Sequence, residues 1–310
     1  MRSTVVSGSF VSLSSMKKLN QFCRDVYYPG VHLYFSLNWV LALYAGLCLN
    51  HGHALEFSPY LVVAILTLYL SLLFLRIMDE IKDYDYDLRF NPERPLVKKS
   101  LTHRDLYLFI LMSCTGFLAL NVFNGVEVLM ILGGQIIYSF LLIVLEQKSQ
   151  RLRDNLLLNL LVTYPVNIAL SVYVMSLFYF QWSTDPLYED LLLLLCFACA
   201  FLYYEFSRKI SPTEDGAEGK RSYSKAWGLR RALILSDGLA LVAIMSMSYL
   251  TQSWVPLLLI AVLVMRASWV VKKKNLTLAG SAFIGLFYGA WMLIALLDYF
   301  DLHLHLLIRS

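Results

Sequence analysis

The chain has 310 residues, of which 58% are hydrophobic and only 15% are charged. A soluble domain carries about a quarter charged residues, so this composition excludes an ordinary soluble protein and indicates an integral, multi-pass membrane protein. The net charge of +4 lies in short segments between apolar runs and forms no continuous basic face, so nucleic acid is not an expected partner.

The N-terminal 33 residues precede the first apolar run. Residues 1–16 are rich in serine and valine, and the stretch 5–10 is too short and too polar to be the core of a cleavable signal. We expect a disordered tail followed by an interfacial segment, with a weak transit peptide as the alternative. The predicted division is therefore a tail over residues 1–33 and a single transmembrane domain over residues 34–310.

Nine apolar runs follow, each near the length that crosses about 30 Å of hydrocarbon. They cover residues 34–50, 59–78, 106–123, 126–145, 156–180, 187–204, 232–250, 254–271 and 280–299. The predicted fold is an all-α, polytopic membrane bundle of about nine transmembrane helices.

Basic residues are concentrated in alternate loops. The N-terminal segment and the loops after the second, fourth, sixth and eighth runs carry nearly all of them, whereas residues 50–58 and 181–186 carry none. Cytoplasmic loops hold the excess of Lys and Arg in membrane proteins. We therefore expect the N-terminus and both long polar loops in the cytoplasm, the C-terminus on the opposite side, and membrane lipids around the helices.

The first long polar loop begins with five acids in nine residues, over residues 79–87. Residues four apart share one face of a helix, so Asp79, Asp83 and Asp87 are expected to form one stripe of carboxylates. Three like charges there need a cation, and Mg²⁺ prefers carboxylate and phosphate oxygens. The alternative is a solvated acidic loop, in which Glu80 and Asp85 in particular have no binding role.

Polar residues also occur within apolar runs. Polar groups inside a membrane face a cavity or bridge helices. Asp237 in the seventh run is therefore expected to face the protein interior, with Arg266 as a candidate partner. The fifth run is unusually polar and either lines an acceptor pocket or bridges helices; its members are Asn159, Thr163, Tyr164, Pro165 and Asn167.

The second long polar loop follows the sixth run. Glu205 is followed within one turn by Arg208 and Lys209, and Asp215 and Lys220 come later in the loop. Acids for a metal ion and bases for a polyanion occur together here, as binding of a diphosphate with Mg²⁺ requires. The alternative is an ordinary cytoplasmic loop that is basic only because of membrane topology.

The first loop resembles the first aspartate-rich motif of the UbiA superfamily of intramembrane aromatic prenyltransferases. The spacing Asp79-x-x-x-Asp83-x-x-x-Asp87 matches that motif, and Arg94 with the following proline matches the Arg-Pro segment after it. Arg76 is a departure, because many members have Asn near this position.

The second loop resembles the second motif less closely. Residues 219–228, Gly-Lys-Arg-Ser-Tyr-Ser-Lys-Ala-Trp-Gly, are similar to the segment that follows this motif in members making quinones. Asp215 falls where the last Asp of the motif belongs. Ser211 stands at the earlier Asp position, and Glu205 is the candidate replacement one turn further up.

This resemblance implies helices around a central cavity and a Mg²⁺-dependent reaction. An isoprenyl group would pass from a prenyl diphosphate to a lipophilic, aromatic acceptor, through ionisation of the diphosphate to a carbocation. The implied catalytic residues are Asp79, Asp83, Glu205 and Asp215. The implied metal ligands are these four and Asp87, and the implied phosphate-binding residues are Arg94, Arg208, Lys209 and Lys220.

Three other functions stay open at the level of sequence. A terpene cyclase on the same scaffold would quench the carbocation with its own double bond, and the altered second motif keeps this alternative. A membrane transporter would place its charges at mid-span, whereas most acids here cluster at the predicted cytoplasmic ends. An inactive homologue is the third of these alternatives.

Overall fold

The computed structural model describes residues 13–211, 222–272 and 276–309. Within these ranges every regular element is a helix, so the predicted all-α fold is confirmed. Residues 1–12 of the predicted disordered tail lie outside the described residues. The last residues of that stretch, 13–16, begin the first helix.

The described elements follow in chain order. The N-terminal half contains α1 (Leu13–Phe22), the π-helix η1 (Cys23–Tyr27), α2 (Pro29–His51), α3 (Pro59–Lys82), α4 (Tyr84–Phe90), α5 (His103–Asn121), α6 (Val126–Lys148) and α7 (Gln150–Asp154). The second half contains α8 (Leu156–Thr163), α9 (Pro165–Trp182), α10 (Tyr188–Lys209), α11 (Tyr223–Trp227), α12 (Leu229–Thr251), the 3₁₀-helix η2 (Val255–Leu259), α13 (Ile260–Val271) and α14 (Thr277–Arg309).

Seven of the described helical segments are long and apolar enough to cross a membrane: α2, α3, α6, α8 with α9, α10, α12 and α14. The two remaining predicted runs are occupied by α5 and by η2 with α13, a shorter apolar segment. A multi-pass membrane protein is thereby confirmed.

Local sequence explains where the helices begin. Proline occupies the first turn of α2, α3 and α9, where its missing N–H costs no hydrogen bond. Tyr28 has a φ of 52° and turns the chain between η1 and α2. Because α2 begins at the next residue, the boundary predicted at residue 34 falls inside this helix. The N-terminal α1 is tied to α5, because the Lys18 ammonium lies 2.8 Å from the Asp105 carboxylate.

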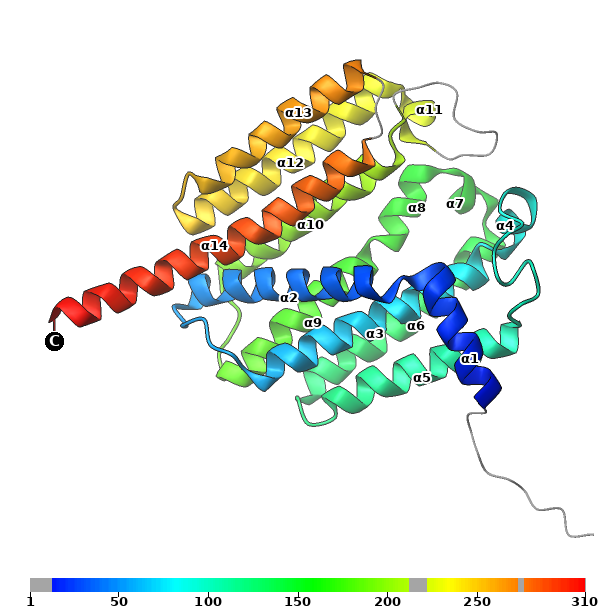
Figure 1. Ribbon diagram of the computed structural model, residues 1–310, viewed down its shortest axis with the longest axis horizontal. Coiled ribbons are helices and arrows are strands. Elements are labelled where there is room, and N and C mark those ends of the chain that lie inside the picture. Colours follow the sequence, from blue (N-terminus) through cyan, green and yellow to red (C-terminus); the bar gives the residue numbers. More distant parts are fainter. Residues whose placement is uncertain (1–12, 212–221, 273–275, 310) are drawn as a thin grey trace, which may run out of the picture.

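The helices form two groups that lie side by side (Figure 1). One group contains α2, α3, α5, α6 and α9, and the other contains α10, α12, α13 and α14. The short helices α4, α7, α8 and α11 gather at one end of the bundle (Figure 1). The described residues that flank the second polar loop therefore lie at the same end of the molecule as the first polar loop, although the two are far apart in sequence.

Glycine allows α10 to approach its neighbours closely. A Cβ added to Gly46 of α2 would lie 2.7 Å from the side chain of Leu193 in α10. A Cβ added to Gly280 of α14 would lie 2.8 Å from the Cβ of Ser207, in the last turns of α10. Small residues permit such close packing between membrane helices, and here they fix the position of α10.

A partly buried ion pair joins helices of the second group. Arg266 of α13 is 1% exposed and donates a hydrogen bond to Asp237 of α12. Its guanidinium also lies 4.9 Å from the ring centroid of Tyr203 in α10, a cation–π distance. The candidate pairing of Asp237 with Arg266 is confirmed, and together with Tyr203 it links α12 and α13 to α10.

Candidate active site

A cavity of about 1230 Å³ opens at the end of the bundle where the short helices gather. Its lining comes from η1, α2, α3, α6, α8, α9 and α10 and from the loop after α4. On α3, Leu72 and Leu75 line it one turn before Arg76 and Asp79. On α10, Phe201 lines it one turn before Glu205. Each helix thus presents an apolar residue deeper in the bundle and a charged residue nearer its end.

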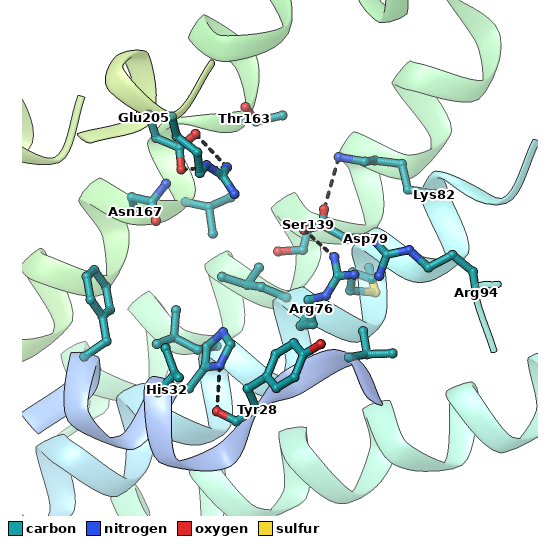
Figure 2. A pocket seen from close by; sticks show the side chains of 18 of the residues that line it. Tyr28, His32, Arg76, Asp79, Lys82, Arg94, Ser139, Thr163, Asn167 and Glu205 are labelled. Carbon is teal, nitrogen blue, oxygen red and sulfur yellow. Dashed lines mark hydrogen bonds and ion pairs between the residues drawn. The ribbon is translucent and has the colours of Figure 1, made fainter. Parts of the chain in front are cut away.

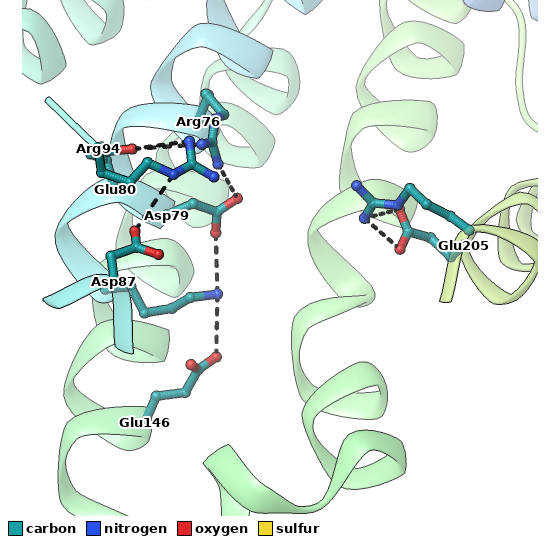
Figure 3. Close-up of polar contacts among 9 residues, drawn as sticks. Arg76, Asp79, Glu80, Asp87, Arg94, Glu146 and Glu205 are labelled. Atoms are coloured by element: carbon teal, nitrogen blue, oxygen red, sulfur yellow. Dashed lines mark hydrogen bonds and ion pairs between the residues drawn. The ribbon is translucent and has the colours of Figure 1, made fainter. Parts of the chain in front are cut away.

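Asp79 lies at the α3 side of the cavity among basic groups (Figure 2). Its carboxylate is 3.1 Å from the Lys82 ammonium and 4.0 Å from the Arg76 guanidinium. Lys82 also lies 3.6 Å from Glu146 of α6 (Figure 3). Asp79 is 47% exposed, so its oxygens are accessible from the cavity.

Buried acids hold Arg94 at the cavity wall. Glu80 is 1% exposed and lies 3.6 Å from Arg76 and 3.7 Å from Arg94. Arg94 in turn lies 3.8 Å from Asp87, whose carboxylate accepts a 2.6 Å hydrogen bond from the Asn91 amide. Glu80 is therefore a buried member of an ion-pair network (Figure 3) and not a solvated loop residue.

The three aspartates do not form one stripe, contrary to the expected geometry. The helix is interrupted at Asp83, with φ −88° and ψ 5°, and α4 begins at the next residue. Asp79 lines the main cavity, whereas Asp83 lines a separate cavity of about 730 Å³. Asp87 is buried against Arg94. The change of direction after α3 accounts for this separation.

The environment of Asp83 favours its neutral form. Burial raises the pKa of this carboxyl to about 6, and the nearby carboxylates of Asp79, Asp87 and Glu146 add to the increase. The Lys82 ammonium opposes them but does not cancel the effect. Near neutral pH, the ionised Asp83 carboxylate therefore lowers the free energy of unfolding.

Glu205 lies on the opposite wall of the cavity, at the end of α10 (Figure 3). One nitrogen of Arg208, Nη2, donates to both Glu205 oxygens at 2.9 Å. The Lys209 ammonium is 3.7 Å from the same carboxylate. All three side chains line the cavity, so both walls present an acid surrounded by bases.

The cavity brings together five of the residues predicted for the site: Asp79, Arg94, Glu205, Arg208 and Lys209. Asp83 and Asp87 lie beside it rather than in its lining. Asp215 and Lys220 lie outside the described residues. The catalytic and metal-binding roles of all of these residues stay predictions.

Several lining residues were not predicted. Arg76 and Lys82 flank Asp79 at three residues on either side, and this spacing on a helix is a signal that places all three together. The N-terminal residues Arg24 and His32 also line the cavity. No sequence pattern indicates their approach, because it depends on how η1 and the start of α2 pack against the bundle.

The polar residues of the fifth predicted span line the cavity where that span breaks. Asn159, Thr163, Tyr164 and Asn167 all contribute to the lining, and Pro165 begins α9 directly after the break. Two of them also bridge helices. The Asn159 amide donates to Glu146 at 3.1 Å, and the Tyr164 hydroxyl donates to the Ala198 carbonyl at 2.5 Å.

The carboxylates at the cavity can hold a Mg²⁺ ion only together with a ligand. Among the described residues, no three Asp, Glu, His or Cys side chains gather in a cluster suited to a metal ion. Asp79 and Glu205 each present carboxylate oxygens to the cavity. Mg²⁺ often takes one or two carboxylates and completes its shell with substrate phosphates and water. The residues therefore fit an ion shared with a phosphorylated ligand, and not a cage of three aspartates.

Comparisons with known proteins support the fold. No protein-family model matches the sequence, and no curated protein matches it. The structure is similar to a UbiA homolog from Aeropyrum pernix K1, with a TM-score of 0.61 and 15% identity over 85% of this chain and 98% of that one. It is also similar to a digeranylgeranylglyceryl phosphate synthase, with a TM-score of 0.55 and 16% identity over 92% of this chain and 98% of that one. The resemblance predicted from the sequence motifs is thus confirmed at the level of the fold.

Proposed function

We propose that this protein is an integral membrane prenyltransferase. It would transfer an isoprenyl group from a prenyl diphosphate to a lipophilic, aromatic acceptor. The observation that carries this proposal is the cavity itself, in which charged residues of α3 and α10 face each other beside an apolar lining. The likeness to a digeranylgeranylglyceryl phosphate synthase supports the same class of reaction.

The charge of the lining suits a diphosphate. The described residues that line the cavity include seven Lys or Arg side chains and four Asp or Glu side chains. A concave site with an excess of one charge attracts ligands of the opposite charge. Arg94, Arg208 and Lys209 would bind the phosphate oxygens, since guanidinium and ammonium groups make short, charge-assisted hydrogen bonds to such anions.

The apolar lining suits the isoprenyl tail. Phe35, Tyr164, Phe201 and Tyr204 all line the cavity. Phe201 is at their centre, with ring centroids 6.0 Å from Phe35, 6.2 Å from Tyr164 and 6.0 Å from Tyr204. An unsaturated hydrocarbon chain is stabilised there by removal of its surface from water.

The proposed reaction breaks the bond between the allylic carbon and the diphosphate oxygen. The electron pair leaves with the oxygen, so negative charge grows on the diphosphate while an allylic cation forms. Basic groups fixed around that oxygen stabilise the transition state more than the ground state. Mg²⁺, when held by Asp79 or Glu205, would neutralise further phosphate charge.

The cation is then attacked by the electron-rich ring of the acceptor, which loses a proton to restore its aromaticity. Aromatic faces in the cavity attract a cation. The apolar lining also limits the access of water, which would otherwise capture the cation as an alcohol. The acceptor is proposed to enter beside the tail, near the break between α8 and α9, where polar side chains line the wall.

The proposal is tested with purified protein in detergent. Labelled geranyl, farnesyl and geranylgeranyl diphosphates are supplied with Mg²⁺, with and without a panel of phenolic and quinone-precursor acceptors. Prenylated acceptor as the product supports a transferase. A cyclic hydrocarbon or alcohol formed without acceptor indicates a cyclase, and failure of every donor to react contradicts the proposed function.

A further inference from the structure

We propose that Arg76, with Lys82 beside it, binds the diphosphate of the donor directly. On the α3 side of the cavity, these two bases would supply the positive charge that binds the phosphates. In the predicted aspartate stripe, a metal ion would supply that charge instead. The inference rests on the proposed function, because it concerns how the same cavity holds its donor. It predicts that diphosphate binding depends only weakly on Mg²⁺.

The Arg76 guanidinium reaches the cavity with unused hydrogen-bond donors (Figure 2). Its two ion pairs, 4.0 Å to Asp79 and 3.6 Å to Glu80, are longer than hydrogen bonds. In the part of the chain that the structure describes, no side chain or carbonyl accepts a hydrogen bond from it. A planar guanidinium in this state matches two phosphate oxygens at once.

The ion pair with Glu80 fixes Arg76 in place but leaves its hydrogen-bond donors unused. Glu80 is buried, and Arg94 already lies 3.7 Å from the same carboxylate oxygen. Arg94 also balances Asp87, at 3.8 Å. Arg76 and Arg94 together balance the two buried carboxylates, and Glu80 holds the Arg76 guanidinium in a defined position at the cavity wall.

Lys82 occupies the place between two carboxylates that a bridging cation would take. Its ammonium is 3.1 Å from Asp79 and 3.6 Å from Glu146, and its side chain is only 17% exposed. A metal ion bound by Asp79 would have to compete with this ammonium. A diphosphate, in contrast, gains from both Lys82 and Arg76, because the lining as a whole carries more bases than acids.

The test is a binding measurement and needs no turnover. Farnesyl thiolodiphosphate, in which sulfur replaces the bridging oxygen and ionisation is slow, is titrated into the detergent-purified full chain. Titrations are made with excess Mg²⁺ and with EDTA. We expect the wild-type dissociation constants in the two conditions to agree within about threefold, and Arg76→Gln to weaken binding about tenfold or more in both.

Two further variants separate charge, geometry and folding. Arg76→Lys keeps the charge but loses the planar fork, so its affinity should lie between those of wild type and Arg76→Gln. Arg104→Gln removes an exposed base of α5 outside the cavity lining and should bind like wild type. Thermal unfolding and gel filtration of each variant show whether a loss of affinity reflects a loss of the fold.

The outcomes distinguish this inference from the proposed function. Binding by wild type only when Mg²⁺ is present would overturn the inference and leave the prenyltransferase proposal in place. Equal affinity of wild type and Arg76→Gln would also overturn it. Absence of binding in both conditions would contradict the inference and the proposed function together.

Discussion

Ion pairing between neighbouring side chains determines what each acid at the site can do. Asp79 and Glu205 face the cavity and are each surrounded by two bases. Asp87 is buried and serves to hold Arg94. Residue type and spacing alone therefore do not decide which of several carboxylates is available to a ligand.

Asp83 provides a prediction about pH. Its pKa rises from 3.8 to about 6 on folding, so the folded protein holds this proton more tightly than the unfolded chain does. Ionisation then costs stability: the cost is absent below about pH 4, grows as the pH rises, and is complete above about pH 6. In EDTA, Asp83→Asn should raise stability by about 1–2 kcal/mol at pH 7.5, allowing for partial solvent exposure, and leave it unchanged near pH 4.

Thermal unfolding in detergent at the two pH values measures this effect. Asp85→Asn is the matched control, because Asp85 is an exposed acid of the same segment. A lower melting temperature of Asp83→Asn at pH 7.5 would mean that the ionised carboxylate stabilises the fold, contrary to the expectation.

At the scale of elements, two helix breaks shape the site. The break at Asp83 separates the three aspartates, and the break between α8 and α9 directs polar side chains into the cavity. Pro165 is a sequence signal for the second break. No proline or glycine occurs between residues 76 and 90 to mark the first break, so no strong signal in the sequence opposed a continuous helix there.

The close contact of α14 with α10 gives a second prediction. Gly280→Ala would place a Cβ 2.8 Å from the Ser207 Cβ and push away the end of α10, which carries Glu205 and Arg208. Overpacking of this kind costs about 1–3 kcal/mol. We expect a lower melting temperature and a several-fold lower turnover number.

Gly285→Ala is the control for this change. It lies on the same helix, and a Cβ there meets no atom within 4 Å. It should be neutral or slightly stabilising, since alanine favours helix more than glycine by about 1 kcal/mol. Equal effects of the two substitutions would show that the α10 contact does not position the site.

At the scale of the whole molecule, the sequence predicted the main features well. The helical runs and the position of the described parts of both polar loops at one end follow from hydropathy and alternation of loops. The cost of a charge in lipid made Arg266 a candidate partner of Asp237, but only the structure shows the pair. The contribution of η1 and the start of α2 to the cavity wall was not predictable, because it arises from contacts between helices distant in sequence.

The orientation of the molecule is a separate prediction. The end that contains the cavity carries most of the basic residues and is expected to face the cytoplasm. In a variant whose native cysteines are replaced, single cysteines are introduced as Ser100→Cys at this end and Asp185→Cys at the other, both exposed positions. An impermeant maleimide should label Asp185→Cys in intact cells and Ser100→Cys only after permeabilisation. The reverse pattern would contradict the orientation.

The central claim is that the cavity between α3 and α10 ionises a prenyl diphosphate. The most direct test is the rate of diphosphate release, measured for wild type, Asp79→Asn and Glu205→Gln, with Asp85→Asn as a control outside this cavity. We predict that the two cavity variants lose about a hundredfold or more and that the control stays near wild type. Release by both cavity variants at the wild-type rate would show that the reaction does not take place between these two walls.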